Sequence, residues 1–372
     1  MNRMRSIAAV SCASLAALAL AAAPAQAAPA PLRADLQDQA DAIVAAGAPG
    51  VSIAVRDELG AWNGVAGVGD IAKGTPPDPG GFIRTGSITK SFTATMVLQL
   101  VEEHQIELDG PIDAYLPGLL PYEETITVED LLRHQSGLPD YQPLVWPDVQ
   151  TVHDQRFHTY LPEALVELAT EEPLEFTPGD EFAYSNTGYI VLGMLIEEVT
   201  DHSYARELAQ RILRPAGLHR TYLAGVFPFL PNPSMRGYEA LTDPEGPLTD
   251  LTTYNMSVSW STGAIVATQA DVNRFYEALL SGDLLGAEQL AQMQETVPAF
   301  DGFGYGLGLA GAELCGREIW GHVGGAQGYL SYSFTSADLS RQLTITVNRS
   351  LTADPAVSEA ITAAIQTEFC RN

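Results

Sequence analysis

The chain has 372 residues, of which 46% are apolar and 8% aromatic, and its formal net charge at pH 7 is −27. This length and composition are typical of a globular protein with one large or two modest cores, and they exclude a disordered chain. The negative charge argues against nucleic acid or an anionic membrane surface as a partner, because both bind basic patches.

The first residues have the pattern of a secretory signal peptide. Arg3 and Arg5 form a basic start, an Ala/Leu/Val-rich stretch covers 7–23, and Ala-Gln-Ala at 25–27 resembles a cleavage site. A retained membrane anchor is the weaker alternative, since the apolar run is short and ends in Pro and small residues. No later segment is long and apolar enough to span a bilayer. We therefore expect residues 1–27 to be removed and a soluble, secreted, monomeric protein to remain.

Removal of that segment leaves two cysteines, Cys315 and Cys370. Two cysteines in an exported chain most simply form one disulfide. Two buried free thiols are the alternative.

Apolar residues at helical spacing predict helices over 32–47 and 87–104, and further helical patterns continue up to residue 200. Between the first two helices, two segments of alternating character predict strands over 51–57 and 61–70.

The last part of the chain changes character. Beyond a Pro-rich loop at 227–250, three consecutive strands are predicted over 316–323, 329–336 and 342–350, and a closing helix over 354–369. Five strands drawn from both chain ends, with a helical block between them, predict an α+β fold. Its centre would be one antiparallel sheet of about five strands, with the terminal helices packed together on one face.

Several familiar motifs can be rejected. Residues 306–311, Gly-Leu-Gly-Leu-Ala-Gly, match the dinucleotide-binding glycine pattern but open no helix. The seven histidines are dispersed and no His-Glu-x-x-His occurs, so a zinc hydrolase is not expected. The chain also lacks Gly-x-Ser-x-Gly, which argues against an α/β-hydrolase. We expect no metal and no cofactor.

The stretch 86–90, Gly-Ser-Ile-Thr-Lys, lies at the predicted start of a helix. Lys90 and Lys73 are the only lysines in a chain that otherwise uses arginine. Ser87 and Lys90 are three residues apart and share one helix face, where free backbone N–H groups stabilise negative charge. Arginine keeps its proton in proteins, whereas a buried lysine can act as a base. Alternatively, Ser87 is a helix N-cap and Lys90 a solvated surface residue.

Two further stretches could contribute side chains to a cleft. Tyr184 and Asn186 lie in a tight loop ahead of a buried helix and offer a phenol for proton transfer and a carboxamide. The alternative is that Asn186 is an N-cap and Tyr184 a core residue. His322 ends a predicted strand, and Gly324 and Gly325 allow a ligand close to the backbone.

These three elements, in this order, resemble the serine β-lactamase and penicillin-binding protein family. That family includes D-alanyl-D-alanine carboxypeptidases, serine β-lactamases, and related esterases and D-amino-acid amidases. Its Ser-x-x-Lys, Tyr-x-Asn and Lys/His-Thr-Gly motifs are similar to residues 87–90, 184–186 and 322–324. Framework stretches at 126–141, 178–200 and 305–309 also look like the family. The resemblance covers nearly all of the mature chain and is closest to secreted D-alanyl-D-alanine carboxypeptidases.

The resemblance implies a fold and a set of roles. Residues 28–372 would form a single catalytic unit, with an α/β subdomain from 32–85 and 262–372 and an all-helical subdomain from 86–261. Ser87 would attack a carbonyl and form an acyl-enzyme. Lys90 would lower the proton affinity of Ser87 and Tyr184, and Tyr184 would pass the proton to the leaving group. Asn186 would orient Lys90 and the substrate amide.

The third motif would form the other wall of the cleft. His322 would support the cleft electrostatically, and the backbone N–H groups of Ser87 and Gly325 would form an oxyanion hole. The expected substrate contacts are Trp146, Trp260, Val323, Gly324 and Gln327.

One departure from the family pattern affects the expected substrate. Carboxypeptidases of this type usually hold the substrate carboxylate with hydroxyls in and after the third motif and with a nearby Arg. Here those hydroxyl positions are Val323 and Gly325, and the stretch directly after residues 305–309 begins Ala310-Gly311, without an Arg. Compensation by Arg236 or Gln327 is the alternative.

The sequence thus favours an exported serine acyl-hydrolase that acts on a D-Ala-D-Ala peptide, a β-lactam or an ester. A D-alanyl-D-alanine carboxypeptidase leads narrowly over an esterase or D-amino-acid amidase. A non-catalytic penicillin-binding or cell-wall-binding module is the alternative of another class, and a degenerate module of that kind would be expected to lack one of the four residues of the first two motifs.

Overall fold

The computed structural model describes residues 31–300, 302–350 and 352–371. The expected signal peptide, residues 1–27, lies outside these ranges. Within them, no helix has the length and apolar character needed to cross a membrane.

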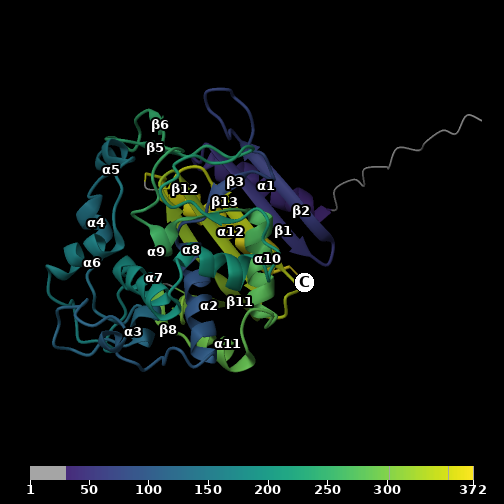
Figure 1. Cartoon of the computed structure of the whole chain (residues 1–372). Helices are drawn as coiled ribbons and strands as arrows, with labels where there is room; N and C mark the ends of the chain where they lie inside the picture. The colour runs from purple at the N-terminus through teal and green to yellow at the C-terminus, as the bar shows by residue number, and fades with distance from the viewer. Residues whose placement is uncertain (1–30, 301, 351, 372) are drawn as a thin grey trace, which may run out of the picture.

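The centre of the molecule is an antiparallel sheet of eight strands in the order β2-β1-β13-β12-β11-β10-β9-β8 (Figure 1). Both chain ends contribute to it, as predicted. The five expected strands are β1 (Gly50–Asp57), β2 (Gly60–Gly67), β11 (Arg317–Ala326), β12 (Tyr329–Ser336) and β13 (Gln342–Val347).

Three further strands extend the sheet beyond the predicted five. They are β8 (Val297–Phe300), β9 (Phe303–Tyr305) and β10 (Ala310–Leu314). Each is short and contains Pro, Gly or Ala, residues with low strand propensity, so alternation along the sequence does not reveal them. They form because each pairs with the strand beside it and, through β10, with β11.

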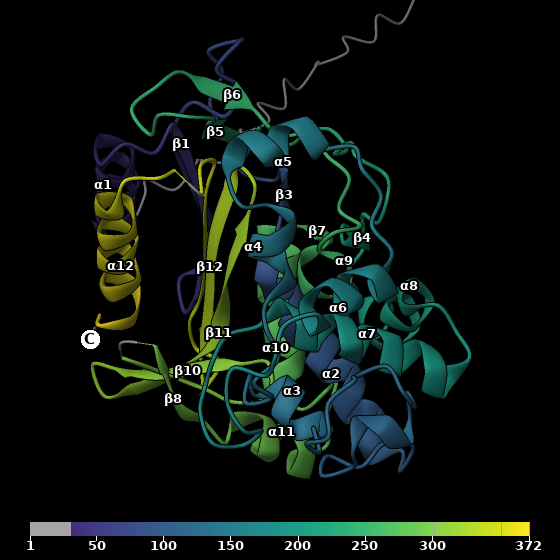
Figure 2. The same cartoon turned by 90° about the vertical axis from the view of Figure 1, so that its left-hand side faces the viewer.

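Two helices from opposite chain ends cover one face of the sheet, as predicted. They are α1 (Pro31–Ala45) and α12 (Pro355–Phe369), and they pack side by side (Figure 2). Alternate side chains of the central strands, such as Ile53 and Ile345, meet Ile361 of α12 in an apolar cluster. The other face of the same strands carries Ser52 and Thr344, which hydrogen-bond to the next layer.

That next layer consists of helices on the opposite face of the sheet. It contains α2 (Thr89–Glu102), α3 (Val128–Leu132), α4 (Tyr141–Val145), α5 (Val149–Gln155), α6 (Pro162–Thr170), α7 (Asn186–Thr200), α8 (Tyr204–Glu207), α9 (Trp260–Gly263), α10 (Gln269–Leu280) and α11 (Ala287–Gln294). Helix α10 lies against the sheet, and Phe92 of α2 stacks on its Phe275 at 3.6 Å between ring centres. Helix α2 is therefore held in the middle of the molecule, buried along nearly all its length.

Two small sheets complete the fold, and the sequence does not predict either. One joins β3 (Phe82–Arg84), β7 (Ile265–Thr268) and β4 (Tyr222–Leu223). The other pairs β5 (Tyr238–Ala240) with β6 (Leu248–Asp250) inside the Pro-rich loop. Strand β3 of the three-stranded sheet leads directly into the turn that carries Ser87.

Candidate active site

Ser87 lies in a single 3-10 turn, η1 (Gly86–Ile88), immediately before α2. Gly86 has φ +55°, and a Cβ atom there would lie 2.4 Å from the carbonyl oxygen of Gly325. Only glycine fits this position, because it has no Cβ and adopts positive φ without strain. Ser87 itself is half-exposed. Its side chain makes no N-cap hydrogen bond to α2, whose N-cap is Ile88, so the N-cap alternative is wrong.

Strand β11 approaches this turn with one edge unpaired. Its pairing with β10 ends at Gly321, so within the described sheet residues 322–326 have no neighbouring strand on that side. A Cβ atom on Gly324 would lie 1.9 Å from the carbonyl oxygen of Thr85. Gly86 and Gly324 are therefore required for the close backbone contact between the serine turn and β11, whereas a Cβ atom on Gly325 would meet only Ser350 Oγ at 3.5 Å.

Lys90 is fully buried, with 0% of its surface exposed, and it connects the first two motifs. Its Nζ donates to Ser87 Oγ at 3.1 Å, to Asn186 Oδ1 at 2.7 Å and to the Thr262 carbonyl at 3.2 Å. These are the three hydrogen bonds that a protonated lysine ammonium can donate. The alternative of a solvated surface lysine is therefore wrong.

Burial lowers the pKa of Lys90 from its ordinary 10.5 to about 7, and the negative charge of Asp140 partly opposes this shift. Asn186 connects the two groups. Its Nδ2 donates to Asp140 Oδ2 at 2.9 Å, and its backbone N–H to Asp140 Oδ1 at 3.3 Å. A chain of hydrogen bonds thus runs from Ser87 through Lys90 and Asn186 to a carboxylate. The lysine amine in it is poised to lose its proton near neutral pH.

Tyr184 lies beside the Ser87–Lys90 pair at the wall of the cleft. The Nζ of Lys90 is 4.9 Å from the centre of its ring. Burial raises the pKa of Tyr184, and the neighbouring Ser87 hydroxyl acts in the opposite direction. Its ring packs against the buried His134 at 4.1 Å between ring centres, with the two ring planes tilted by 33°. Tyr184 is therefore a neutral phenol, held in place by an aromatic neighbour and in contact with Ser87.

His322 lies behind Tyr184, 6.5 Å away between ring centres, and is buried. Its Nδ1 donates to the Val323 carbonyl, so its neutral Nε2 accepts from the Tyr305 hydroxyl at 2.9 Å. Burial, with a smaller contribution from Lys90, lowers the pKa of His322 to about 3. His322 is therefore uncharged at neutral pH, so any electrostatic support it gives the cleft comes from a neutral ring.

A cavity of about 700 Å³ opens at Ser87 and Tyr184. Its lining includes Val323 and is otherwise mainly apolar: Phe300, Phe303, Tyr305, Ala310, Ala312, Leu314, Ile319, Tyr332, Phe334 and Ile365. Among the described lining residues there is no Lys or Arg, and Glu313 is the one acidic side chain.

The remaining residues expected to contact substrate lie elsewhere. Trp146 and Trp260 belong to the apolar core of the helical layer, where Trp260 packs against Tyr204 at 5.4 Å between ring centres. Gln327 is buried in the turn between β11 and β12. None of the three lines the cavity. Their role as substrate contacts stays a prediction.

The compensating arginine is also absent from the cleft. The guanidinium of Arg236 binds Asp70 at 3.2 Å and Asp250 at 2.9 Å. It is neutralised by two carboxylates and does not line the cavity. Of the two compensating residues considered, neither Arg236 nor Gln327 lines the cavity at Ser87.

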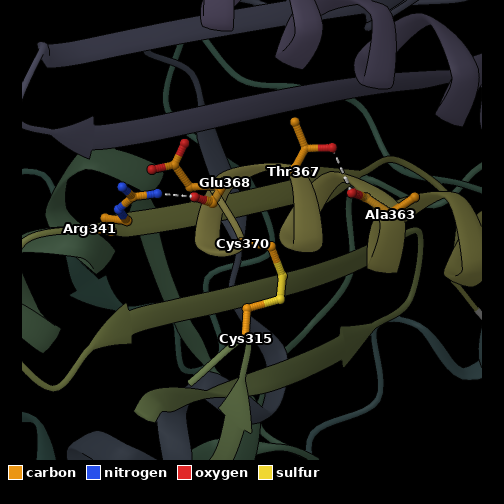
Figure 3. The surroundings of a disulfide bond; sticks show 6 residues. All are labelled: Cys315, Arg341, Ala363, Thr367, Glu368 and Cys370. Atoms are coloured by element: carbon orange, nitrogen blue, oxygen red, sulfur yellow. Dashed lines mark hydrogen bonds between the residues drawn. A yellow bond between two sulfur atoms is a disulfide. The ribbon is translucent and has the colours of Figure 1, made fainter. Parts of the chain in front are cut away.

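The two cysteines form a disulfide, as the sequence most simply predicts. Cys315, in the turn between β10 and β11, is bonded to Cys370 at the end of α12, with 5.2 Å between the Cα atoms (Figure 3). The alternative of two free thiols is wrong.

The sequence reading missed three residues of the site. Asp140 and His134 lie in the framework stretch 126–141, and Tyr305 begins the stretch 305–309. Both stretches were recognised as similar to the family. Nothing in their local sequence pattern showed that Asp140 contacts Asn186, that His134 contacts Tyr184, or that Tyr305 contacts His322. Only the packing of α3 and α4 against α7, and the place of β9 in the sheet next to β10 and β11, bring them there.

A family model described as Beta-lactamase matches residues 33–368. The chain belongs to the beta-lactamase family. It is a serine hydrolase of this family, and the predicted α+β fold with an antiparallel sheet, flanking terminal helices and a helical subdomain is confirmed.

Proteins similar to this chain include an amidohydrolase, an amidase and a penicillin-binding protein. A D-stereospecific amidohydrolase from Streptomyces sp. is 35% identical, with a TM-score of 0.82 over 91% of this chain and 98% of that one. The D-amino acid amidase from Ochrobactrum anthropi SV3, solved with L-phenylalanine amide, is 27% identical, with a TM-score of 0.81 over 91% and 98%. Penicillin-binding protein 4 from Amycolatopsis lactamdurans is 27% identical over 76% of each chain.

Proposed function

We propose that this serine hydrolase cleaves amides or esters that carry no carboxylate and whose acyl group is apolar, including amides of D-amino acids. The observation that carries this proposal is the cavity at Ser87, whose described lining is mainly apolar, lacks Lys and Arg, and contains one carboxylate, Glu313. Such a lining stabilises a neutral substrate and disfavours a substrate carboxylate. The similarity to two amidases supports the same choice.

The proposed mechanism uses the hydrogen-bonded groups around Ser87. Neutral Lys90 accepts the proton of Ser87 as its Oγ attacks the substrate carbonyl carbon. The proton then reaches the leaving amine or alcohol through the Tyr184 hydroxyl, and the C–N or C–O bond breaks. Water attacks the resulting ester of Ser87 by the same route in reverse, which releases the acid and restores the enzyme.

The surrounding groups hold this reaction in place. Asn186 orients Lys90 through its carboxamide, and Asp140 holds Asn186. The backbone N–H groups of Ser87 and Gly325 stabilise the oxyanion. His322, which is neutral, fixes Tyr305 against the back of the cleft rather than providing charge.

A D-alanyl-D-alanine carboxypeptidase is the second candidate, favoured by the similarity to penicillin-binding protein 4. It requires a group that holds a terminal carboxylate. In the described structure Val323 occupies the hydroxyl position, and Arg236 is bound by two carboxylates. The geometry therefore favours the amidase or esterase.

The test compares kcat/KM for D-phenylalanine amide and p-nitrophenyl butyrate with D-alanine release from a peptide ending in D-Ala-D-Ala. We expect Ser87-dependent hydrolysis of the two substrates without a carboxylate at least tenfold above that of the peptide. Faster D-alanine release would overturn the preference, and activity retained by Ser87→Ala would overturn the mechanism. If no substrate or penicillin leaves an adduct at Ser87, the protein is a non-catalytic module.

We also propose that the protein acts outside the cytoplasm as a monomer, after removal of residues 1–27. The signal-like composition of that segment supports export, and the Cys315–Cys370 bond is typical of exported proteins. Mass spectrometry of protein secreted by the native host tests the cleavage after residue 27.

A further inference from the structure

The cavity at Ser87 continues to the opposite face of the sheet. At one end it is lined by Ser87 and Tyr184, which belong to the helical layer. At the other end it is lined by Ile365 and Gln366 of α12, which covers the other face. One space therefore connects the nucleophile with the layer of the terminal helices.

The strand edge described above explains how this connection is possible. Ile319 and Val323 of β11 belong to the apolar cluster on the α12 side, whereas His322 points to the helical layer. Because β10 stops at the partner of Gly321, no strand covers β11 beside Val323 among the described residues. Val323 thus lies where the cavity passes from Ser87 toward α12. A Thr or Ser there would place a hydroxyl in this passage.

Beyond Val323, most of the described side chains that line the cavity are aliphatic or aromatic. Phe303, Ala312 and Leu314 of the outer strands face Tyr332 and Phe334 of β12 and Ile365 of α12. At the opening, Phe300 is 49% exposed and packs on Tyr184 at 6.2 Å between ring centres. Large apolar side chains exposed in a connected surface commonly mark a binding site. The volume of about 700 Å³ is within the range of small-molecule sites.

The disulfide holds the far wall of this space in place. It joins the β10–β11 turn to the end of α12, so it fixes the two elements between which the cavity ends (Figure 3). Glu368 and Arg341, next to it, add a hydrogen bond from the Arg341 guanidinium to the Glu368 carbonyl at 2.6 Å. The separation of α12 from the hairpin is therefore set covalently.

We propose that the part of the cavity beyond Val323 is an acyl-chain site, which binds the apolar part of the acyl donor while Ser87 attacks its carbonyl. This inference rests on the proposed function and narrows it to donors with an extended apolar acyl group. Burial of one methylene group changes a binding constant about fourfold. The site should therefore select donors by the length of their apolar part.

The first experiment measures kcat/KM for p-nitrophenyl acetate, butyrate, hexanoate and octanoate with the full mature chain. We expect a rise of roughly twofold to fourfold per methylene group, corrected for the rate of each ester with Ser87→Ala. A flat or falling series from a Ser87-dependent enzyme would overturn the acyl-chain site and leave the proposed function intact. Absence of all Ser87-dependent hydrolysis would overturn the proposed function itself.

The second experiment fills the site and uses a matched control. Ala312 is half-buried on β10 opposite Ile319, so Ala312→Phe should occupy the space of the chain. We expect the octanoate-to-acetate ratio of kcat/KM to fall at least tenfold. Ala356→Phe adds the same group to the exposed start of α12 outside the cavity, and should keep the wild-type ratio.

A third variant keeps the test decisive if Ala312→Phe fails to fold. Thr362 is exposed on α12 and lines the end of the cavity, so Thr362→Trp should leave the fold intact and lower the ratio for octanoate selectively. An unchanged ratio in a correctly folded Ala312→Phe or Thr362→Trp variant would contradict the proposed site. Thermal melting and circular dichroism establish that each variant is folded.

Discussion

The two ends of the cavity differ in the kind of group that they present. Around Ser87, polar side chains are buried and linked to one another, and Lys90 makes three hydrogen bonds. Beyond Val323, the described walls are mainly aliphatic and aromatic. The first region therefore suits the reaction and the second suits a choice among substrates. A substitution in one region should therefore leave the function of the other region intact enough to be measured.

The largest expected effect comes from Lys90→Arg, which keeps the positive charge but removes a base. Arginine does not lose its proton in a protein, so the transfer from Ser87 should fail. We expect kcat/KM to fall by about 10³-fold for acetate and octanoate esters alike. Steady-state kinetics on both esters checks this, with Lys73→Arg on the surface as the matched control. An active Lys90→Arg variant would show that the amine is not the base.

Removal of the disulfide should affect the second region and the stability of the fold. The bond closes a loop with a sequence separation of 55 residues, so Cys315→Ser with Cys370→Ser should lower the free energy of unfolding by about 3–4 kcal/mol. Urea unfolding measures this change. At temperatures where the variant stays folded, acetate hydrolysis should persist while the octanoate preference weakens. Loss of acetate hydrolysis in the folded variant would show that the two regions are not separable.

Asp140→Asn should affect the first region through Asn186 and Lys90. Loss of the hydrogen bonds to a charged acceptor should lower kcat roughly tenfold to hundredfold. Because the negative charge of Asp140 raises the pKa of Lys90, its removal should also move the rise of kcat/KM with pH to lower pH. A purely structural role would lower the rate without this shift. The pH profile of the variant distinguishes the two.

The smallest expected effect concerns Glu368, next to the disulfide. Burial raises the pKa of this carboxyl from 4.5 to about 7, so the folded state binds more protons than the unfolded state between these values. Its contribution to stability is therefore lost as the pH rises from 4.5 through 7. Glu368→Gln should be more stable than wild type by on the order of 1 kcal/mol at pH 8, and not at pH 4.5. Urea unfolding at both values checks this, and an equal difference at both would contradict it.

The sequence predicts the first region better than the second for a physical reason. Ser87 and Lys90 are three residues apart on one helix, so their proximity follows from local geometry. The five long strands also follow from local alternation. Asp140 is close to Asn186 only through the packing of α4 against α7, and no local pattern shows this.

The apolar region could not be predicted because its walls come from distant segments. Phe303 and Ala312 lie on short strands of weak propensity, and Ile365 lies near the end of the chain. As separate residues they are ordinary core positions. Trp146 and Trp260, predicted as substrate contacts, likewise pack in or against the core of the helical layer and do not line this cavity.

The most direct test of the central claim, that a neutral Lys90 activates Ser87, is the pH dependence of kcat/KM for p-nitrophenyl acetate. This parameter reports the groups that titrate in the free enzyme. With the pKa of Lys90 near 7, kcat/KM should rise about tenfold per pH unit below that value and level off above it. A rise that continues to about pH 10, or a rate that falls as the pH increases through 7, would contradict the account.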